Sequence, residues 1–265
     1  MPGSRLDEPR YVFGEDGAHE QHQYLAEAYD PLSTARLAGT GVTDGWHCLE
    51  VGAGGGSVAV WLAERVAPTG EVLATDLEPR HIPRRPKLTV LRHDVVTDPL
   101  PENGFDLIHA RLVLRHLPRR AVVLGRLLAA LKPGGWLQLD EFDTSYQPCL
   151  LGPDASAERL FSSFLAAKDA VMAAAGVDGA WGRHAGAAMR RAGFTGIDVW
   201  PQLERWQGGS PGLRLLAQHT YRLREGLLAG GMTDGQLQEI RALLADPSFC
   251  VSSSVMYSVQ GRRPR

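Results

Sequence analysis

The residues best suited to do chemistry form a glycine-rich turn, Glu50-Val51-Gly52-Ala53-Gly54-Gly55-Gly56. The turn follows an apolar run at residues 46–49 and leads into a helical pattern at residues 57–67. Glycine lets the backbone approach a ligand with no Cβ in the way, and the start of a helix presents unpaired N–H groups to polar or anionic atoms. A strand, a glycine turn and a helix in this order indicate a site for a nucleoside-bearing cofactor in an α/β protein.

The elements that position this turn follow from the pattern of apolar residues. Short apolar runs predict five strands, at residues 46–51, 71–75, 88–92, 105–110 and 136–141. Helical spacing predicts a helix after the glycine turn and a second one that ends at Lys132-Pro133-Gly134-Gly135. Alternating strands and helices predict a parallel sheet with helices on both faces.

Such sheets bind ligands at the carboxyl ends of their strands. The site candidates are therefore the residues just after each predicted strand, at positions 52–56, 76–77, 94–95, 111–112 and 141–143.

The rest of the chain adds helices and two strands. Helical spacing covers residues 19–39, where Pro31 is expected to divide the segment into two helices. Thr233 is a candidate N-cap for the last of the predicted helices. Those helices cover residues 154–175, 185–192, 213–228 and 234–244, and the strands cover residues 197–200 and 251–261.

Five segments, taken in order, resemble the motifs of the class I S-adenosylmethionine-dependent methyltransferases that act on small molecules. They are Glu50 with the Gly-x-Gly-x-Gly run, Asp76, His93-Asp94-Val95, Asp106-Leu107-Ile108 with Leu114-Arg115-His116-Leu117, and residues 131–135. The resemblance covers residues 46–142 well and the remainder in outline. It implies an α/β fold with a Rossmann-like sheet of seven strands flanked by helices, whose last strand is antiparallel, and an extra helical cap.

The resemblance also implies a division of the chain. Residues 1–45 would form an N-terminal arm and lid helices, and residues 46–145 the core that binds S-adenosylmethionine. Residues 181–203 would continue this core, and residues 251–265 would supply its final strand. The two cap insertions would lie at residues 146–180 and 204–250.

S-adenosylmethionine is the cofactor that the resemblance implies, and acidic residues are expected to hold it. Asp76 can accept two hydrogen bonds from the ribose hydroxyls, and Asp94 can bond the adenine amino group. Each of these carboxylates could instead cap a turn. Glu50 is expected to orient the glycine loop, or to reach the methionine end through water, and the backbone of Arg111 is expected to face the methionine moiety.

Other residues complete the expected cofactor site. Leu77 and Val95 could enclose the adenine or simply belong to the core, and Gln23 or Tyr24 could bond the methionine carboxylate or only pack. The full expected set is Gln23, Tyr24, Glu50, Gly52, Ala53, Gly54, Asp76, Leu77, Asp94, Val95 and Arg111.

Methyl transfer requires alignment of the nucleophile with the methyl group, and a hydroxyl or amine nucleophile also requires a base. The candidate bases are His116, Glu141, Asp143, His184 and His219. The first three follow predicted strands on the cleft side, and the two others lie in segments expected to roof the site. Each could instead have a structural role. Aromatic residues in the expected cap favour a drug-sized organic substrate.

Composition excludes other classes of protein. The net charge of −2 and the pI near 6.5 argue against broad binding of nucleic acid, and the basic residues between positions 80 and 92 are interpreted as a solvated face. Three widely spaced cysteines predict reduced thiols in a cytoplasmic protein, with no metal site. No apolar run reaches the ~20 residues of a membrane-spanning helix. The oligomeric state stays open, with a homodimer as one option.

The sequence therefore predicts transfer of a methyl group from S-adenosylmethionine to an oxygen, nitrogen or carbon atom of a small molecule, in the biosynthesis of a natural product. A non-methylating enzyme of the same fold and a non-catalytic module that binds the cofactor are the alternatives. A dinucleotide site is less favoured because Ser57 stands where the dinucleotide fingerprint requires glycine. An RNA methyltransferase would require a basic, aromatic RNA surface that the sequence does not show.

Overall fold

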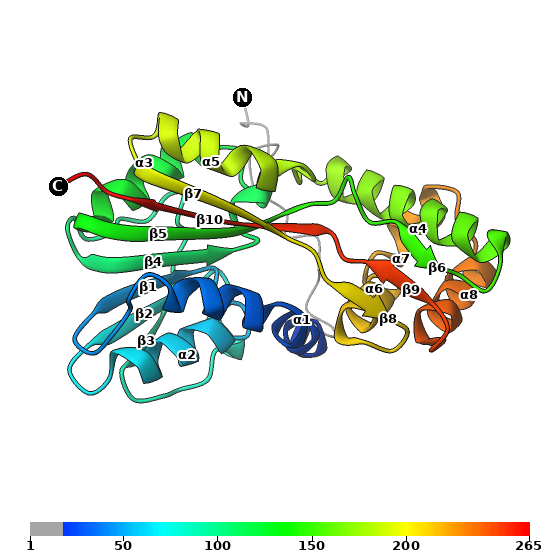
Figure 1. The fold of residues 1–265 in the computed structure, drawn as a ribbon, viewed down its shortest axis with the longest axis horizontal. Coiled ribbons are helices and arrows are strands. Elements are labelled where there is room, and N and C mark those ends of the chain that lie inside the picture. Colours follow the sequence, from blue (N-terminus) through cyan, green and yellow to red (C-terminus); the bar gives the residue numbers. More distant parts are fainter. Residues whose placement is uncertain (1–17) are drawn as a thin grey trace, which may run out of the picture.

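The computed structural model describes residues 18–265, which form a core sheet with a cap beside it (Figure 1). The core sheet has the strand order β3-β2-β1-β4-β5-β10-β7. Its strands are β1 (His47–Val51), β2 (Glu71–Asp76), β3 (Leu88–Arg92), β4 (Phe105–Arg111), β5 (Leu131–Asp143), β7 (Thr195–Gln202) and β10 (Val255–Arg262). Strands β1 to β5 pair in parallel, whereas β10 is antiparallel to both β5 and β7. The predicted seven-stranded sheet with an antiparallel last strand is confirmed.

Helices cover both faces of this sheet. On one face lie α1 (Ala18–Ala38) and α2 (Ser57–Val66), and on the other lie α3 (Arg120–Ala130) and α5 (Trp181–Arg191). Side chains alternate along each strand, so neighbouring residues of β1 enter different cores. Cys48 packs with α2, whereas Leu49 packs with α3 and α5. The short 3₁₀ turns η1 (Pro79–His81) and η2 (Leu114–His116) follow β2 and β4.

The expectation that Pro31 divides the first helix is wrong, since α1 is continuous from Ala18 to Ala38. Proline removes one backbone donor, which costs one intrahelical hydrogen bond. Here the proline ring points to solvent, while Tyr29, Ser33 and Leu37 are buried on the opposite side of the helix. The burial of this face stabilises a single helix despite the proline.

Four helices and a second sheet form the cap. The helices are α4 (Ala155–Ala174), α6 (Pro211–Arg222), α7 (Arg224–Ala229) and α8 (Asp234–Ala245), and the sheet joins β6 (Cys149–Leu151), β9 (Cys250–Ser252) and β8 (Arg205–Gln207). The predicted single helix over residues 213–228 is therefore wrong, because Leu223 leaves helical geometry between α6 and α7. Thr233 does form the N-cap of α8, with Gln236 completing a capping box.

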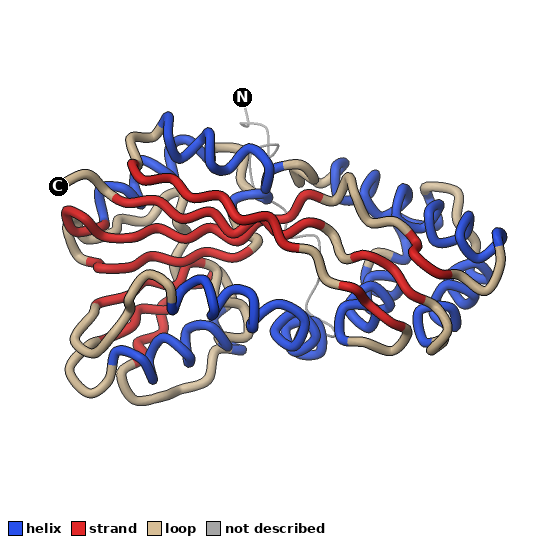
Figure 2. Tube along the Cα trace, in the orientation of Figure 1, coloured by secondary structure: helices blue, strands red, loops and turns tan. Residues whose placement is uncertain are grey.

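Three stretches of chain run directly from the core sheet into the cap sheet (Figure 2). They join β5 to β6, β7 to β8 and β9 to β10. The predicted single strand over residues 251–261 is in fact two strands, because the chain leaves one sheet and enters the other at Ser253 and Ser254. The hydroxyl of Ser253 accepts a hydrogen bond from the backbone N–H of Glu204 at 2.9 Å, which ties two of the crossings together.

Candidate functional site

The glycine turn has a backbone that only glycine adopts easily. Gly52, Gly54 and Gly56 have φ values of 63°, 55° and 77°, in the left-handed region. At Gly52 a Cβ would also lie 2.4 Å from Cγ2 of Val113. A side chain at this position would therefore force both the turn and its neighbour to move.

Asp76, at the end of β2, holds this turn. Its carboxylate accepts hydrogen bonds from the backbone N–H of Gly54 at 2.8 Å and of Glu78 at 2.9 Å. A carboxylate has about four lone-pair positions, so acceptor capacity remains for a ligand. The side chain is half-buried at the carboxyl edge of the sheet, where it can accept hydrogen bonds from a diol.

The residues after β3 have more local roles. The carboxylate of Asp94 accepts hydrogen bonds from the backbone N–H of Val96 at 2.8 Å and from the hydroxyl of Thr97 at 3.1 Å. Val95 is buried in the core shared with α3 and α5, and Leu77 is largely exposed. Asp94 therefore caps its own turn in this structure, which leaves its remaining lone pairs for a ligand.

Helix α1 covers the glycine turn through a residue that the sequence analysis missed. A Cβ on Gly55 would lie 2.8 Å from Cβ of His22, and the rings of His22 and His81 meet edge to face at 5.6 Å. Gln23 instead bonds Glu27 on the exposed side of the helix. Tyr24 packs against the cap. His22 lies seven residues before the buried Tyr29 and therefore on the same face of the helix. This spacing could have indicated that His22 faces the protein.

His22 also provides a test of whether this site fits a polar ligand. Its Nδ1 is buried and has no hydrogen-bond partner among residues 18–265. Burial lowers the pKa of His22, so the ring is neutral and offers one donor and one acceptor. An unsatisfied polar atom beside a turn of glycines fits a ligand with polar groups, as the amino acid and ribose parts of S-adenosylmethionine would be.

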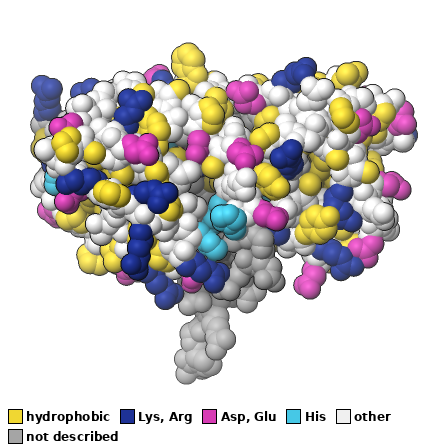
Figure 3. Space-filling model, turned by 90° about the horizontal axis from the view of Figure 1, so that it is seen from below, with side chains coloured by type: hydrophobic (Ala, Val, Ile, Leu, Met, Phe, Trp, Pro, Cys, Tyr) yellow, Lys and Arg dark blue, Asp and Glu magenta, His cyan; other side chains and the backbone are white. Residues whose placement is uncertain are grey.

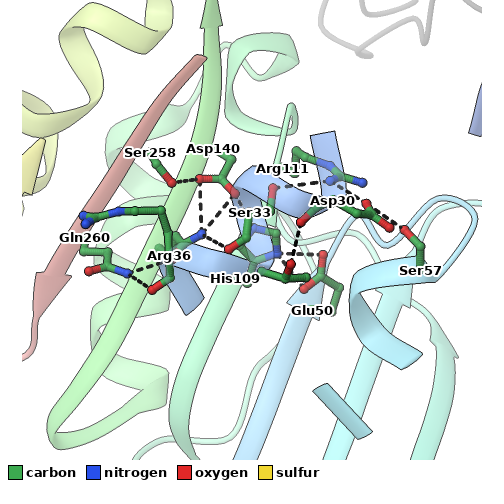
Figure 4. A network of polar contacts seen from close by, with 12 residues as sticks. Asp30, Ser33, Arg36, Glu50, Ser57, His109, Arg111, Asp140, Ser258 and Gln260 are labelled. Atoms are coloured by element: carbon green, nitrogen blue, oxygen red, sulfur yellow. Dashed lines mark hydrogen bonds and ion pairs between the residues drawn. The ribbon is translucent and has the colours of Figure 1, made fainter. Parts of the chain in front are cut away.

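A buried network of charged residues underlies the turn (Figure 4). Nδ1 of His109 lies 2.7 Å from Oε2 of Glu50, and its Nε2 lies 2.9 Å from Oδ2 of Asp140. Ser258 also donates to Asp140. Burial lowers the pKa of His109, but the interactions with the two carboxylates outweigh the effect of burial. The net result is a pKa raised from 6.5 to about 9. The imidazole is therefore a cation, and both oxygens of Glu50 are engaged by it rather than by the turn.

Arg111 connects the same region to α1. Its Nη1 donates to Oδ1 of Asp30 at 2.8 Å and to the hydroxyl of Ser33 at 3.3 Å. The hydroxyl of Ser57, at the start of α2, donates to the same oxygen of Asp30 at 3.1 Å. Asp30 thus joins α1 to β4 and to the helix that follows the glycine turn (Figure 4).

A second polar cluster lies where β4 and β5 end beneath the cap. It contains Arg115 and His116 of η2, Glu141 of β5, Lys168 of α4 and His219 of α6, and charges on Arg115 influence the titration of the four others. Burial raises the pKa of Glu141 to about 8. Burial, followed by nearby cations, lowers the pKa of His116 to about 4 and that of His219 to about 3. This cluster brings together three of the five candidate bases.

The two other candidate bases lie elsewhere. Asp143 is paired with Arg183 of α5, which more than offsets the effect of burial and lowers the pKa of the carboxyl group. His184 is exposed on α5, the helix that packs against β5 and β10 of the core sheet. Neither side chain takes part in the cluster beneath the cap.

Among residues 18–265, no group of three or more His, Cys, Asp or Glu side chains is arranged to hold a metal ion. Within the same residues, no helix is both long and apolar enough to span a bilayer. Acidic and basic side chains are interspersed over much of the face shown in Figure 3, and histidine side chains gather near its middle.

Comparison with known proteins agrees with the fold. A family model described as a methyltransferase domain matches residues 49–137. Methyltransferase str3 of Strobilurus tenacellus is 35% identical over 127 residues, 46% of this chain and 43% of that protein. Methyltransferase str2 of the same fungus is 42% identical over 99 residues, 36% of this chain and 35% of that protein. The chain thus spans less than half the length of these curated relatives.

Solved structures share the fold over nearly the whole chain. Phosphoethanolamine N-methyltransferase 2 of Haemonchus contortus, in complex with S-adenosyl-L-methionine, has a TM-score of 0.59 and 14% identity, covering 97% of this chain and 59% of that one. The chain therefore shares the fold of this methyltransferase, and its residues 49–137 match the model of a methyltransferase domain.

Proposed function

We propose that the protein transfers the methyl group of S-adenosylmethionine to an oxygen, nitrogen or carbon atom of a small organic molecule. The observation that carries this proposal is the turn with glycines of positive φ, held by the carboxylate of Asp76. Asp76 would accept hydrogen bonds from the ribose, and the glycines would let the ligand approach the backbone of the turn closely. The cofactor supplies an electrophilic methyl group, so the chain needs chiefly to hold both reactants in line.

The remaining expected cofactor residues are part of the same proposal. The backbone of Arg111 would face the methionine end, since its side chain is held by Asp30. Asp94, Leu77 and Val95 would surround the adenine at the end of β3. Glu50 would act through His109, since that imidazole engages both of its carboxylate oxygens.

The biological setting is part of the same proposal. The resemblance to methyltransferases of small molecules supports a role in making a natural product. The cysteines of the chain, Cys48, Cys149 and Cys250, are free thiols, which supports a cytoplasmic location. The division into core and cap near residues 146, 181, 204 and 251 is part of the proposal, as is a homodimer as one option for assembly.

The test begins with calorimetric titration of the protein with S-adenosylhomocysteine, with NAD in parallel. Micromolar binding of the first ligand alone is expected. Candidate acceptors are then incubated with S-adenosylmethionine, and mass spectrometry should find a methylated product and S-adenosylhomocysteine in equal amounts. A product changed without methylation would support the alternative of a non-methylating enzyme. Binding without any turnover would support a binding module.

Glu141 is proposed as the base where the nucleophile must lose a proton. Its pKa of about 8 is better matched to this role than the pKa values of about 4 and 3 at His116 and His219. Since a base acts in its deprotonated form, kcat should rise with pH through about 8. In Glu141→Gln, kcat should fall about 10²- to 10⁴-fold and lose that rise. The exposed Glu239→Gln serves as the control, and an unchanged profile in Glu141→Gln would exclude Glu141.

A further inference from the structure

Arg115 is a buried cation that has no hydrogen-bonded counter-charge among residues 18–265. Only 5% of the residue is exposed, and its Nε has no hydrogen-bond partner within the described chain. Its guanidinium lies over the ring of Phe142, with Cζ 5.6 Å from the ring centroid. Burial lowers the pKa of Arg115, yet a guanidinium remains charged in proteins.

Among residues 18–265, none of the carboxylates around Arg115 forms an ion pair with it, although Oε2 of Glu141 has no hydrogen-bond partner of its own. Asp169 bonds Lys168 at 2.6 Å, and Asp178 lies 3.3 Å from a guanidinium nitrogen of Arg120. Glu141 accepts from the backbone N–H of Leu114 at 2.8 Å, and its raised pKa of about 8 leaves it mostly neutral at pH 7.

Tyr29 also faces Arg115 and is neutral as well, because burial raises the pKa of its phenol. Within the part of the chain that the structure describes, the charge of Arg115 therefore has no ion-pair partner beneath the cap.

An unmatched buried charge costs several kcal/mol, so its presence indicates a ligand that completes it. The planar fork of arginine matches a carboxylate, which it binds through two parallel hydrogen bonds. We propose that Arg115 anchors a carboxylate of the methyl acceptor, at the end of β4 beneath the cap. This inference rests on the proposed function, since it names the substrate class of the same site.

The surroundings of Arg115 favour a monoanion with an apolar body. A single unmatched cation balances one negative charge, whereas a phosphate monoester would bring close to two. Phe142 lies beside the guanidinium, and the ring of Tyr29 lies 4.9 Å from the ring of Phe142. The acceptor is therefore an aromatic or otherwise apolar carboxylic acid whose methylated atom lies apart from the anchored carboxylate.

The test uses the full chain saturated with S-adenosylhomocysteine, with benzoate as the probe and benzamide as its neutral match. Nuclear magnetic resonance follows the Nε–H signal of Arg115, assigned by its loss in Arg115→Met. Benzoate should shift this signal saturably and bind at least about tenfold more tightly than benzamide. Arg115→Met should reduce the preference to within about twofold, whereas the exposed Arg190→Met should keep it.

Two results would overturn the proposal. One is equal affinity of the wild-type protein for benzoate and benzamide, or no saturable shift with either. The other is tighter binding of phenyl phosphate than of benzoate, which would indicate a dianion site. If S-adenosylhomocysteine does not bind, the proposed function fails, but the preference for benzoate is still measured on the free protein.

Stability separates a ligand anchor from a structural ion pair. Removing a cation that has no partner should leave the melting temperature of Arg115→Met unchanged or raised, because no pair is broken and a buried charge is lost. If Arg115 instead stabilises Glu141 in the folded protein, Arg115→Met should melt at a lower temperature. A lower melting temperature together with a retained preference for benzoate would assign Arg115 a structural role only.

Discussion

Asp76→Ala is expected to weaken the binding of S-adenosylhomocysteine about 10- to 150-fold, the equivalent of 1.5–3 kcal/mol for hydrogen bonds to a charged group. The substitution removes the proposed ribose acceptor. It also frees the backbone N–H of Gly54, which the carboxylate holds at 2.8 Å. Both changes act on the same ligand, so the loss should lie toward the upper end of the range.

Calorimetry measures this effect directly. Glu71→Ala, at the exposed opposite end of β2, is the matched control and should bind as the wild type does. Circular dichroism checks that both variants fold. Undiminished affinity in a folded Asp76→Ala protein would show that the ribose is held elsewhere.

His109→Gln is expected to destabilise the protein by about 3–5 kcal/mol, the cost of leaving buried charges without their partner. The substitution leaves the carboxylates of Glu50 and Asp140 facing a neutral side chain, with almost no access to solvent. Urea denaturation measures the loss. His47→Gln, whose side chain is exposed at the start of β1, should change stability little.

The same network predicts how stability depends on pH. The pKa of His109 is raised from 6.5 to about 9, so the stabilisation is complete below pH 6.5 and is lost as pH rises through about 9. A shift of this size corresponds to about 3 kcal/mol. His109→Gln should lose this dependence if it folds. Glu141, whose pKa is raised from 4.5 to about 8, adds a separate decline up to about pH 8, so the contribution of His109 is measured between about pH 8 and 9. A wild-type free energy of unfolding that stays level over that interval would mean that His109 is neutral.

The fold could be predicted from the sequence because its signals are local. Apolar periodicity and glycine turns located the strands of the core, and the strand-end rule pointed to Asp76 and Glu141. The role of His109 could not be predicted in this way, because it lies within β4 and its partners come from β1 and β5. Arg115 lay within a recognised motif, but only tertiary packing shows that its charge is buried.

Local rules also failed where packing outweighs propensity. Pro31 lowers the helix propensity of its segment, yet the buried side of α1 keeps one helix. Apolar residues at 213–228 continue the helical pattern across the break at Leu223, because both helices bury the same face of the cap. Sequence periodicity reports which face is buried and not where the helix axis changes direction.

The three crossings between the core sheet and the cap sheet limit how acceptor scope can be altered, in nature or by engineering. A cap inserted at one point in a chain can be exchanged as a single cassette with two junctions. Here β5, β7 and β10 each continue into the cap, so an exchange needs compatible junctions at all three crossings at once. New acceptors should therefore arise more readily by point substitution of side chains beneath the cap than by recombination of whole caps.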